Sequence, residues 1–115
     1  MNEKKRTRHI VNALLFYCLE NDITSVQLDI SYEETQLSLQ LQGISKKLPA
    51  NINEFLDLLN TPRDTSIEGY YDELLGSGKE TLNAQDYRLL GMALDHVEMT
   101  YEDQSFQLNL TRFFH

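Results

Sequence analysis

The chain has 115 residues, of which 41% are hydrophobic and 24% charged, and its formal net charge is −8. This length suits a single domain over residues 1–115, and the composition excludes an intrinsically disordered chain. An acidic body repels phosphate groups and anionic lipid, so we expect neither nucleic acid nor a membrane as the main partner.

Cysteine usage and the start of the chain bear on its compartment. The single cysteine, Cys18, cannot form an internal disulfide, which suits a reducing compartment. Residues 1–9 are basic, but no secretory-signal pattern follows, and the apolar run over 14–19 is far shorter than the roughly 20 residues that span a bilayer. We expect a cytoplasmic protein whose basic start is a solvated helix start or a frayed terminus, with a small nucleic-acid contact as the alternative.

The first element expected is a helix over about residues 5–20. Apolar residues recur there every four positions in two adjacent rows, which predicts a broad buried stripe. The rows are Ile10, Leu14 and Cys18, and beside them Val11, Leu15 and Leu19. Asn21 and Asp22 then break the helix.

Two segments alternate strictly between apolar and polar residues, which is typical of β-hairpins with one apolar and one wet face. The first covers residues 26–32 and 37–42, with a turn at 33–36. The second covers residues 97–101 and 106–111, with a turn at 102–105. The segment between the first hairpin and the next helix, residues 43–50, is expected to be a connection.

Helical sequence fills the space between the hairpins. Asn51 with Glu54 has the spacing of an N-cap and its capping-box partner, and the helix it opens carries Ile52, Phe55, Leu56 and Leu59 on one side. Pro62 ends that helix, because proline cannot continue helical hydrogen bonding. A short helix is expected near residues 66–75, closed by the glycines of 76–78.

The last helix has the clearest start signal. Asn83 and Asp86 have capping-box spacing, and Leu82 with Tyr87 has the spacing of a hydrophobic staple. The element order is therefore α-ββ-α-α-α-ββ. Because the apolar faces of the hairpins must be covered, we expect an α+β two-layer sandwich of about four antiparallel strands with helices on one face. The strand order stays open.

This order resembles the ATP-binding domain of sensor histidine kinases and anti-sigma-factor kinases. Asn12-Ala13-Leu14 is similar to the core of that family's N-box, whose Asn helps to hold magnesium. Of the family's Asp-x-Gly-x-Gly motif the segment 41–45 keeps only Gly43, and a phosphate loop would be Gly76-Ser77-Gly78-Lys79. The resemblance implies a shortened relative with a degenerate, nucleotide-free site.

No residue set has the spacing of a catalytic, cofactor or metal site, so none is assigned. His9, His96 and His115 lack partners at metal-ligand spacing, and Asp95 and Glu98 flank His96 without forming a motif. Cys18 lies on the apolar stripe, so we expect a buried, inert thiol.

Three surface features are candidates for protein contacts. Tyr70 and Tyr71 are adjacent, so either one ring is exposed at an interface or both lie along the core boundary. Phe113 and Phe114 either dock on the core or form a sticky patch, and docking is favoured. The wet face of the sheet is rich in amides, and it either stacks on a partner or is hydrated: Gln27, Asp29, Ser31, Ser38, Gln40, Gln42, Glu98, Thr100, Gln107, Asn109 and Thr111.

The leading functional hypothesis is a small cytoplasmic, non-enzymatic binding or regulatory module that acts through protein contacts, a homodimer being one form. It rests on a complete fold pattern without catalytic residues and on an acidic, amide-rich surface. The alternative is a nucleotide-binding ATPase or kinase-like domain, which rests on Asn12 and residues 76–78.

Overall fold

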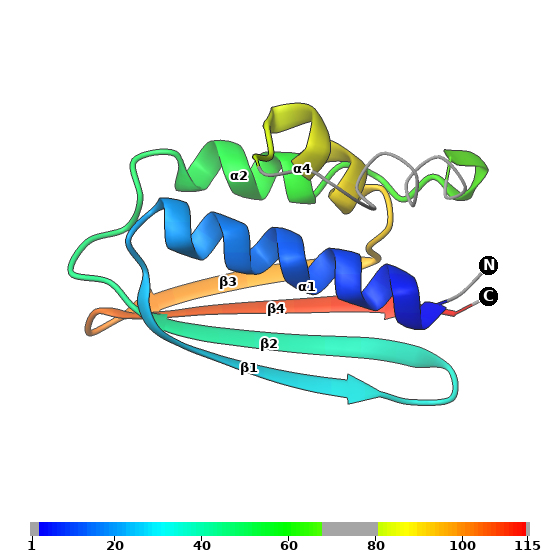
Figure 1. The fold of residues 1–115 in the computed structure, drawn as a ribbon, viewed down its shortest axis with the longest axis horizontal. Helices are drawn as coiled ribbons and strands as arrows, with labels where there is room; N and C mark the ends of the chain where they lie inside the picture. The colour runs from blue at the N-terminus through cyan, green and yellow to red at the C-terminus, as the bar shows by residue number, and fades with distance from the viewer. Residues whose placement is uncertain (1–2, 68–80, 115) are drawn as a thin grey trace.

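The computed structural model describes residues 3–67 and 81–114, and it confirms the α+β two-layer sandwich and its order (Figure 1). In chain order the elements are α1 (Glu3–Glu20), β1 (Thr24–Tyr32), β2 (Gln36–Ile44), α2 (Ile52–Leu59), η1 (Thr65–Ile67), α4 (Ala84–Gly91), β3 (His96–Glu102) and β4 (Ser105–Phe113). The short 3-10 helix η1 begins where the middle helix is expected, and the rest of that helix lies outside the described residues.

All four strands form one antiparallel sheet in the order β1-β2-β4-β3. The two hairpins therefore meet through their second strands, β2 and β4. Across this junction Leu39 lies opposite Leu110, and Leu41 lies opposite Leu108. The returning strands become the centre of the sheet, and β1 and β3 become its edges.

The core lies between the two central strands and the helix layer. Six side chains on the inner face of these strands are each at most 2% exposed: Leu37, Leu39, Leu41, Phe106, Leu108 and Leu110. Burying a side chain of this size stabilises a fold by roughly 1.5–3 kcal/mol, so this layer dominates the hydrophobic contribution of the sheet. The alternation seen in the sequence is thus confirmed as one dry face.

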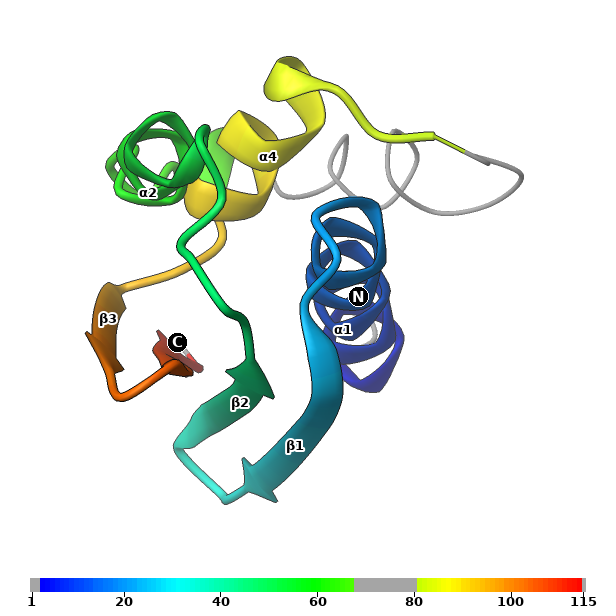
Figure 2. The same ribbon diagram turned by 90° about the vertical axis from the view of Figure 1, so that its left-hand side faces the viewer.

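The three helices lie side by side on that face (Figure 2). Helix α1 lies on the β1 side, α2 on the β3 side, and α4 between them. The predicted stripe of α1 is wrong at one margin, because Leu19 is 76% exposed. Ala13 and Tyr17 are buried instead. The helix is turned toward α2, where the Tyr17 ring stacks on a ring of that helix, and this contact outweighs the burial of Leu19.

The two predicted capping boxes have different outcomes. At α4 the box is confirmed: Asp86 N donates to Asn83 Oδ1 at 3.1 Å, and Asn83 N donates to Asp86 Oδ2 at 2.8 Å. At α2 it is wrong, because Asn51 makes no side-chain cap hydrogen bond. Its side-chain oxygen instead accepts a hydrogen bond from the Tyr17 hydroxyl at 2.7 Å. A tertiary partner has replaced the local one.

The sequence suggested that Gly43 belongs to a connection, but in the structure it is an inner-face residue of β2. It pairs with Phe106 of β4, and a Cβ atom placed on it would lie 2.4 Å from Cγ2 of Ile23. The missing side chain lets Ile23 close that end of the core. The turn of the second hairpin is confirmed, with positive φ angles of 53° and 67° at Asp103 and Gln104.

The basic start of α1 is solvated only in part, because Lys4, Lys5 and Arg8 are exposed, as expected, whereas Arg6 is not. Arg6 is only 1% exposed, and its Nη1 donates to Glu3 Oε1 at 3.1 Å. Arg112 of β4 is also 1% exposed and donates two hydrogen bonds to the Glu3 carboxylate, from Nε to Oε2 at 3.0 Å and from Nη2 to Oε1 at 2.9 Å. Its Nη1 donates to the Ala93 carbonyl at 2.8 Å. This Glu3 cluster, formed by Glu3, Arg6 and Arg112, ties the first turn of the chain to its last strand.

Candidate functional site

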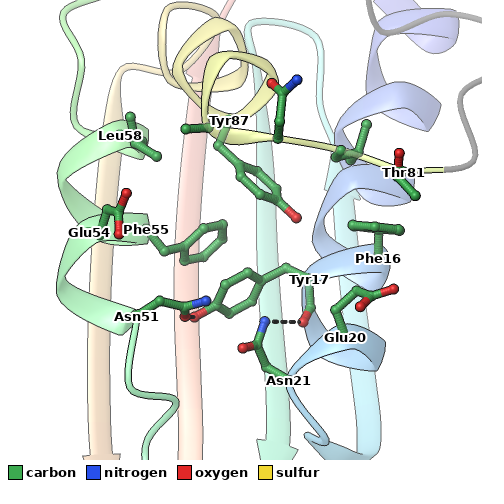
Figure 3. Close-up of a pocket in the computed structure, with 13 residues that line it drawn as sticks. Phe16, Tyr17, Glu20, Asn21, Asn51, Glu54, Phe55, Leu58, Thr81 and Tyr87 are labelled. Atoms are coloured by element: carbon green, nitrogen blue, oxygen red, sulfur yellow. Dashed lines mark hydrogen bonds between the residues drawn. The ribbon is translucent and has the colours of Figure 1, made fainter.

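A cleft of about 340 Å³ opens between the C-terminal half of α1, helix α2 and the segment that leads into α4 (Figure 3). It is called the helical cleft below. Described residues from all three helices line it: Phe16, Tyr17, Glu20, Asn21, Asn51, Glu54, Phe55, Leu58, Thr81, Leu82, Asn83, Ala84 and Tyr87.

Three buried aromatic rings form the floor of the helical cleft. Tyr17 stacks on Phe55 with ring centroids 3.6 Å apart and planes inclined by 9°. Tyr87 meets both rings edge-on, with centroids 6.0 Å from Tyr17 and 5.1 Å from Phe55. Edge-to-face pairs of this kind contribute about 0.5–1.5 kcal/mol beyond the area they bury. The floor is therefore a fixed surface shared by the three helices.

The two tyrosine hydroxyls differ in their surroundings. Burial, helped by the neighbouring Tyr87 and Cys18, raises the pKa of Tyr17 well above its usual value. Burial, followed by the nearby Glu20 and Asp86 carboxylates, raises the pKa of Tyr87 to about 12. Both groups are therefore protonated at neutral pH. Tyr17 donates its proton to Asn51, whereas no hydrogen bond joins the Tyr87 hydroxyl to the described part of the chain.

The local sequence explains how Tyr87 reaches the cleft. The capping box fixes the first turn of α4, and Tyr87 is the fourth helical residue, on the side of that turn that faces α1 and α2. Leu82 stands just before the N-cap and also lines the cleft. Both residues of the hydrophobic-staple pair predicted from the sequence thus line the site.

The rim of the helical cleft carries negative charge. Glu20 of α1 and Glu54 of α2 are both exposed, and they lie on opposite helices (Figure 3). None of the described residues that line the cleft is basic. Neither carboxylate forms an ion pair with any residue in the described ranges 3–67 and 81–114. The rim can therefore accept hydrogen bonds from a cationic group.

A second candidate surface is the free edge of β1. Within the described residues this strand pairs only with β2, so its other side presents backbone groups that no described strand pairs with. Ile30 and Tyr32 are inner-face residues of β1, yet they are 51% and 43% exposed. A hollow of about 450 Å³ lies beside Ile30 and is also lined by Val11 and Asn12 of α1. The helix layer therefore leaves this edge of the core open.

The polar face of the sheet lies opposite the helices, as predicted. Its residues align in cross-strand rows, one of which runs Asp29, Gln40, Asn109 and Glu98. The hydrogen bonds between the described amides on this face are long, with Gln42 Nε2 donating to Gln107 Oε1 at 3.4 Å. Such bonds are weak, so the face is held mainly by its backbone ladder.

Several sequence candidates have structural roles. Cys18 is buried, as expected, and burial raises its pKa to about 11, which makes the thiol unreactive at neutral pH. Phe114 docks as expected, with its ring centroid 5.1 Å from that of Tyr32. Asp95 binds Arg63 at 2.7 Å and accepts a hydrogen bond from the backbone of β4.

The remaining candidates are placed as follows. His96 does not follow a helix end but begins β3, where its ring meets Phe113 edge-on at 5.6 Å. Asn12 is exposed on α1. Tyr70, Tyr71, the 76–79 segment and His115 lie outside the described residues, so the nucleotide-binding alternative stays a prediction.

Comparisons with family models, curated proteins and solved structures give no match to this chain. Across residues 3–67 and 81–114 no helix is both long and apolar enough to cross a membrane. In the same residues no three His, Cys, Asp or Glu side chains are grouped so that they could hold a metal ion. Any inference about function therefore depends on the chemistry of the helical cleft and of the free edge of β1.

Proposed function

We propose that this chain is a small, non-enzymatic, cytoplasmic binding module that acts through protein contacts, and that β1 binds a second copy of the chain. The observation that supports this most directly is the exposure of Ile30 and Tyr32 on an unpaired edge strand. Edge strands of this kind accept another strand through main-chain hydrogen bonds, with alternate side chains giving specificity. The opposite edge, β3, carries Glu98 and Glu102, which oppose such pairing.

The sequence of β1 is compatible with antiparallel pairing to itself. The regular part of the strand is 27–32, because a register shift occurs between Thr24 and Gln27. A two-fold axis at Ile30 places Ile30 against its own copy and Leu28 against Tyr32, all on the apolar face. On the polar face it places Asp29 against Ser31. This register covers the exposed apolar side chains without bringing two charges together.

Replacing Ile30 with lysine tests this proposal. Ile30→Lys places two ammonium groups opposite each other at the two-fold axis, and an inward-pointing charge on an edge strand blocks strand pairing. We expect the wild-type chain to elute as a dimer, and the variant as a monomer, in size-exclusion chromatography with light scattering. Leu19→Lys is the matched control, because Leu19 is exposed on α1 and lies outside β1. Equal masses for both variants would contradict the proposal.

A charge series tests the register separately. Ser31 and Gln27 both lie two residues from Asp29 on the polar face, but only Ser31 faces Asp29 of the second copy. Two symmetric cross-strand pairs, each contributing about 0.5 kcal/mol, change affinity about fivefold. We expect Ser31→Lys to tighten the dimer by that factor and Ser31→Glu to weaken it equally, measured by sedimentation. Gln27 faces Glu33 of the second copy, which lies beyond the end of β1, so the same changes there should act in the same direction but alter affinity less than about twofold. A larger effect at Gln27 than at Ser31 would show a different register.

A further inference from the structure

We propose that the helical cleft binds the cationic side chain of a lysine or arginine presented by a peptide segment of a protein partner. This inference concerns a different surface from β1 and does not depend on the pairing of two copies. It rests on three properties of the cleft: its charge, a hydroxyl group with an unused bonding capacity, and apolar walls.

The charge of the cleft selects a cation. Glu20 and Glu54 approach it from opposite helices, and no described lining residue is basic. The chain as a whole carries a net charge of −8, so its long-range field also attracts basic segments. An anionic ligand would meet two carboxylates without a compensating partner from the described residues.

The Tyr87 hydroxyl provides an independent indication of a polar ligand. The Tyr87 side chain is 9% exposed, and it points into the space between α1 and α2 (Figure 3). No described residue hydrogen bonds to its hydroxyl. The hydroxyl oxygen is open to the cleft and is not among the buried polar atoms that lack a partner, so an ammonium or guanidinium N–H can reach its lone pairs. Burial first, and then the nearby Glu20 carboxylate on the rim of the cleft, raises the pKa of Tyr87.

The walls of the cleft suit the methylene part of such a side chain. Phe16, Leu58 and Leu82 are all half-buried, so each keeps apolar surface that faces the cleft. Lysine and arginine cover apolar surface with their methylene groups while the charged end meets polar groups. The combination of an apolar wall, an acidic rim and a hydroxyl that faces the cleft matches that two-part chemistry. A compact inorganic cation has no methylene groups to cover these apolar walls.

The test is a titration of the full chain, followed by amide chemical shifts, with four probes. N-acetyl-lysine-amide and N-acetyl-arginine-amide carry the charge on a peptide unit, N-acetyl-norleucine-amide keeps the apolar stem without charge, and n-butylammonium lacks the peptide unit. We expect the two charged amides to bind at low-millimolar concentration and to shift the amides of Phe16, Leu82 and Tyr87. The norleucine amide should bind at least about tenfold more weakly, because it cannot make the charged hydrogen bonds, and tenfold corresponds to about 1.4 kcal/mol.

Variants separate a cation site from a general apolar cleft. Glu20→Gln and Tyr87→Phe should each weaken the lysine amide about fivefold. Glu98→Gln is the matched control, because it removes the same charge from the opposite face of the sheet and should change binding less than about twofold. Equal affinity for the norleucine and lysine amides, or no shifts with any probe, would overturn the proposal. Tighter binding of n-butylammonium than of the lysine amide would exclude a peptide side chain as the ligand.

Discussion

Replacing Glu3 with glutamine is expected to lower the free energy of unfolding by about 2–3 kcal/mol. The Glu3 carboxylate is shared by two guanidinium groups whose side chains are only 1% exposed, those of Arg6 and Arg112. A neutral amide cannot offset two buried positive charges, and it can accept fewer of their hydrogen bonds. Glu3 itself is 28% exposed, which keeps the expected loss toward the lower end of the range for buried pairs.

Thermal and urea unfolding of Glu3→Gln would measure this effect. A loss of about 2–3 kcal/mol corresponds to a fall in Tm of roughly 8–15 °C for a domain of this size. Glu98→Gln removes the same charge at an exposed position and should change stability by less than about 0.5 kcal/mol. If the two variants were equally stable, the Glu3 cluster would have no role in holding α1 to the sheet.

The change Gly91→Ala is expected to cost about 2 kcal/mol, although alanine is the better helix former. Gly91 is the last residue of α4, and a Cβ atom there would lie 2.4 Å from the Leu58 carbonyl oxygen and 2.7 Å from that of Leu59. Both contacts are with the backbone of α2, which cannot move aside as a flexible side chain can. Alanine gains up to about 1 kcal/mol in helix propensity, and overpacking against a fixed backbone outweighs that gain.

Chemical denaturation gives the sign of this effect directly. Gln85→Ala makes a propensity change at an exposed position of the same helix and should be neutral or slightly stabilising. Because α2 and α4 form two walls of the helical cleft, Gly91→Ala should also shift the amide resonances of Phe55 and Tyr87. A Gly91→Ala chain as stable as Gln85→Ala would show that the two helices are not in close contact.

The hairpins were predictable because their signal is local. Strict alternation over residues 37–42 and 106–111 places the apolar side chains on one face regardless of what lies beyond, and that face is the core. Strand order was not predictable, since the contact of β2 with β4 joins residues about 70 positions apart and depends on the whole sheet. Arg112 continues the inner-face series of Phe106, Leu108 and Leu110, and because a buried arginine needs a carboxylate, this position in the sequence already indicates an ion pair.

The helical cleft could be predicted only in parts. Phe55 and Tyr87 were placed on apolar sides of their helices, and the capping box that positions Tyr87 was found correctly. The role of Tyr17 was missed, because the stripe of α1 was centred too near Leu19. Asn51 was assigned to a local cap, yet its oxygen is used by the Tyr17 hydroxyl from another helix. Local rules do not include such partners, so a site built from three helices emerges only from the tertiary structure.

The two proposed surfaces differ in kind. The edge of β1 is an apolar strand that recognises another strand, whereas the helical cleft recognises a charged side chain. A chain that pairs along β1 would present two such clefts in one particle, so that two weak sites could act together on a basic partner. Pairing along β1 therefore underlies the proposed function as a whole.

Sedimentation equilibrium of the unmodified chain, from about 1 to 500 μM, tests that pairing most directly. We expect a monomer–dimer equilibrium whose limiting mass is twice the chain mass of 13.4 kDa. Amide hydrogen exchange in 28–32 should slow as the dimer forms, because the free edge of β1 becomes hydrogen-bonded. A mass of one chain at every concentration, with unchanged exchange in β1, would contradict the proposal.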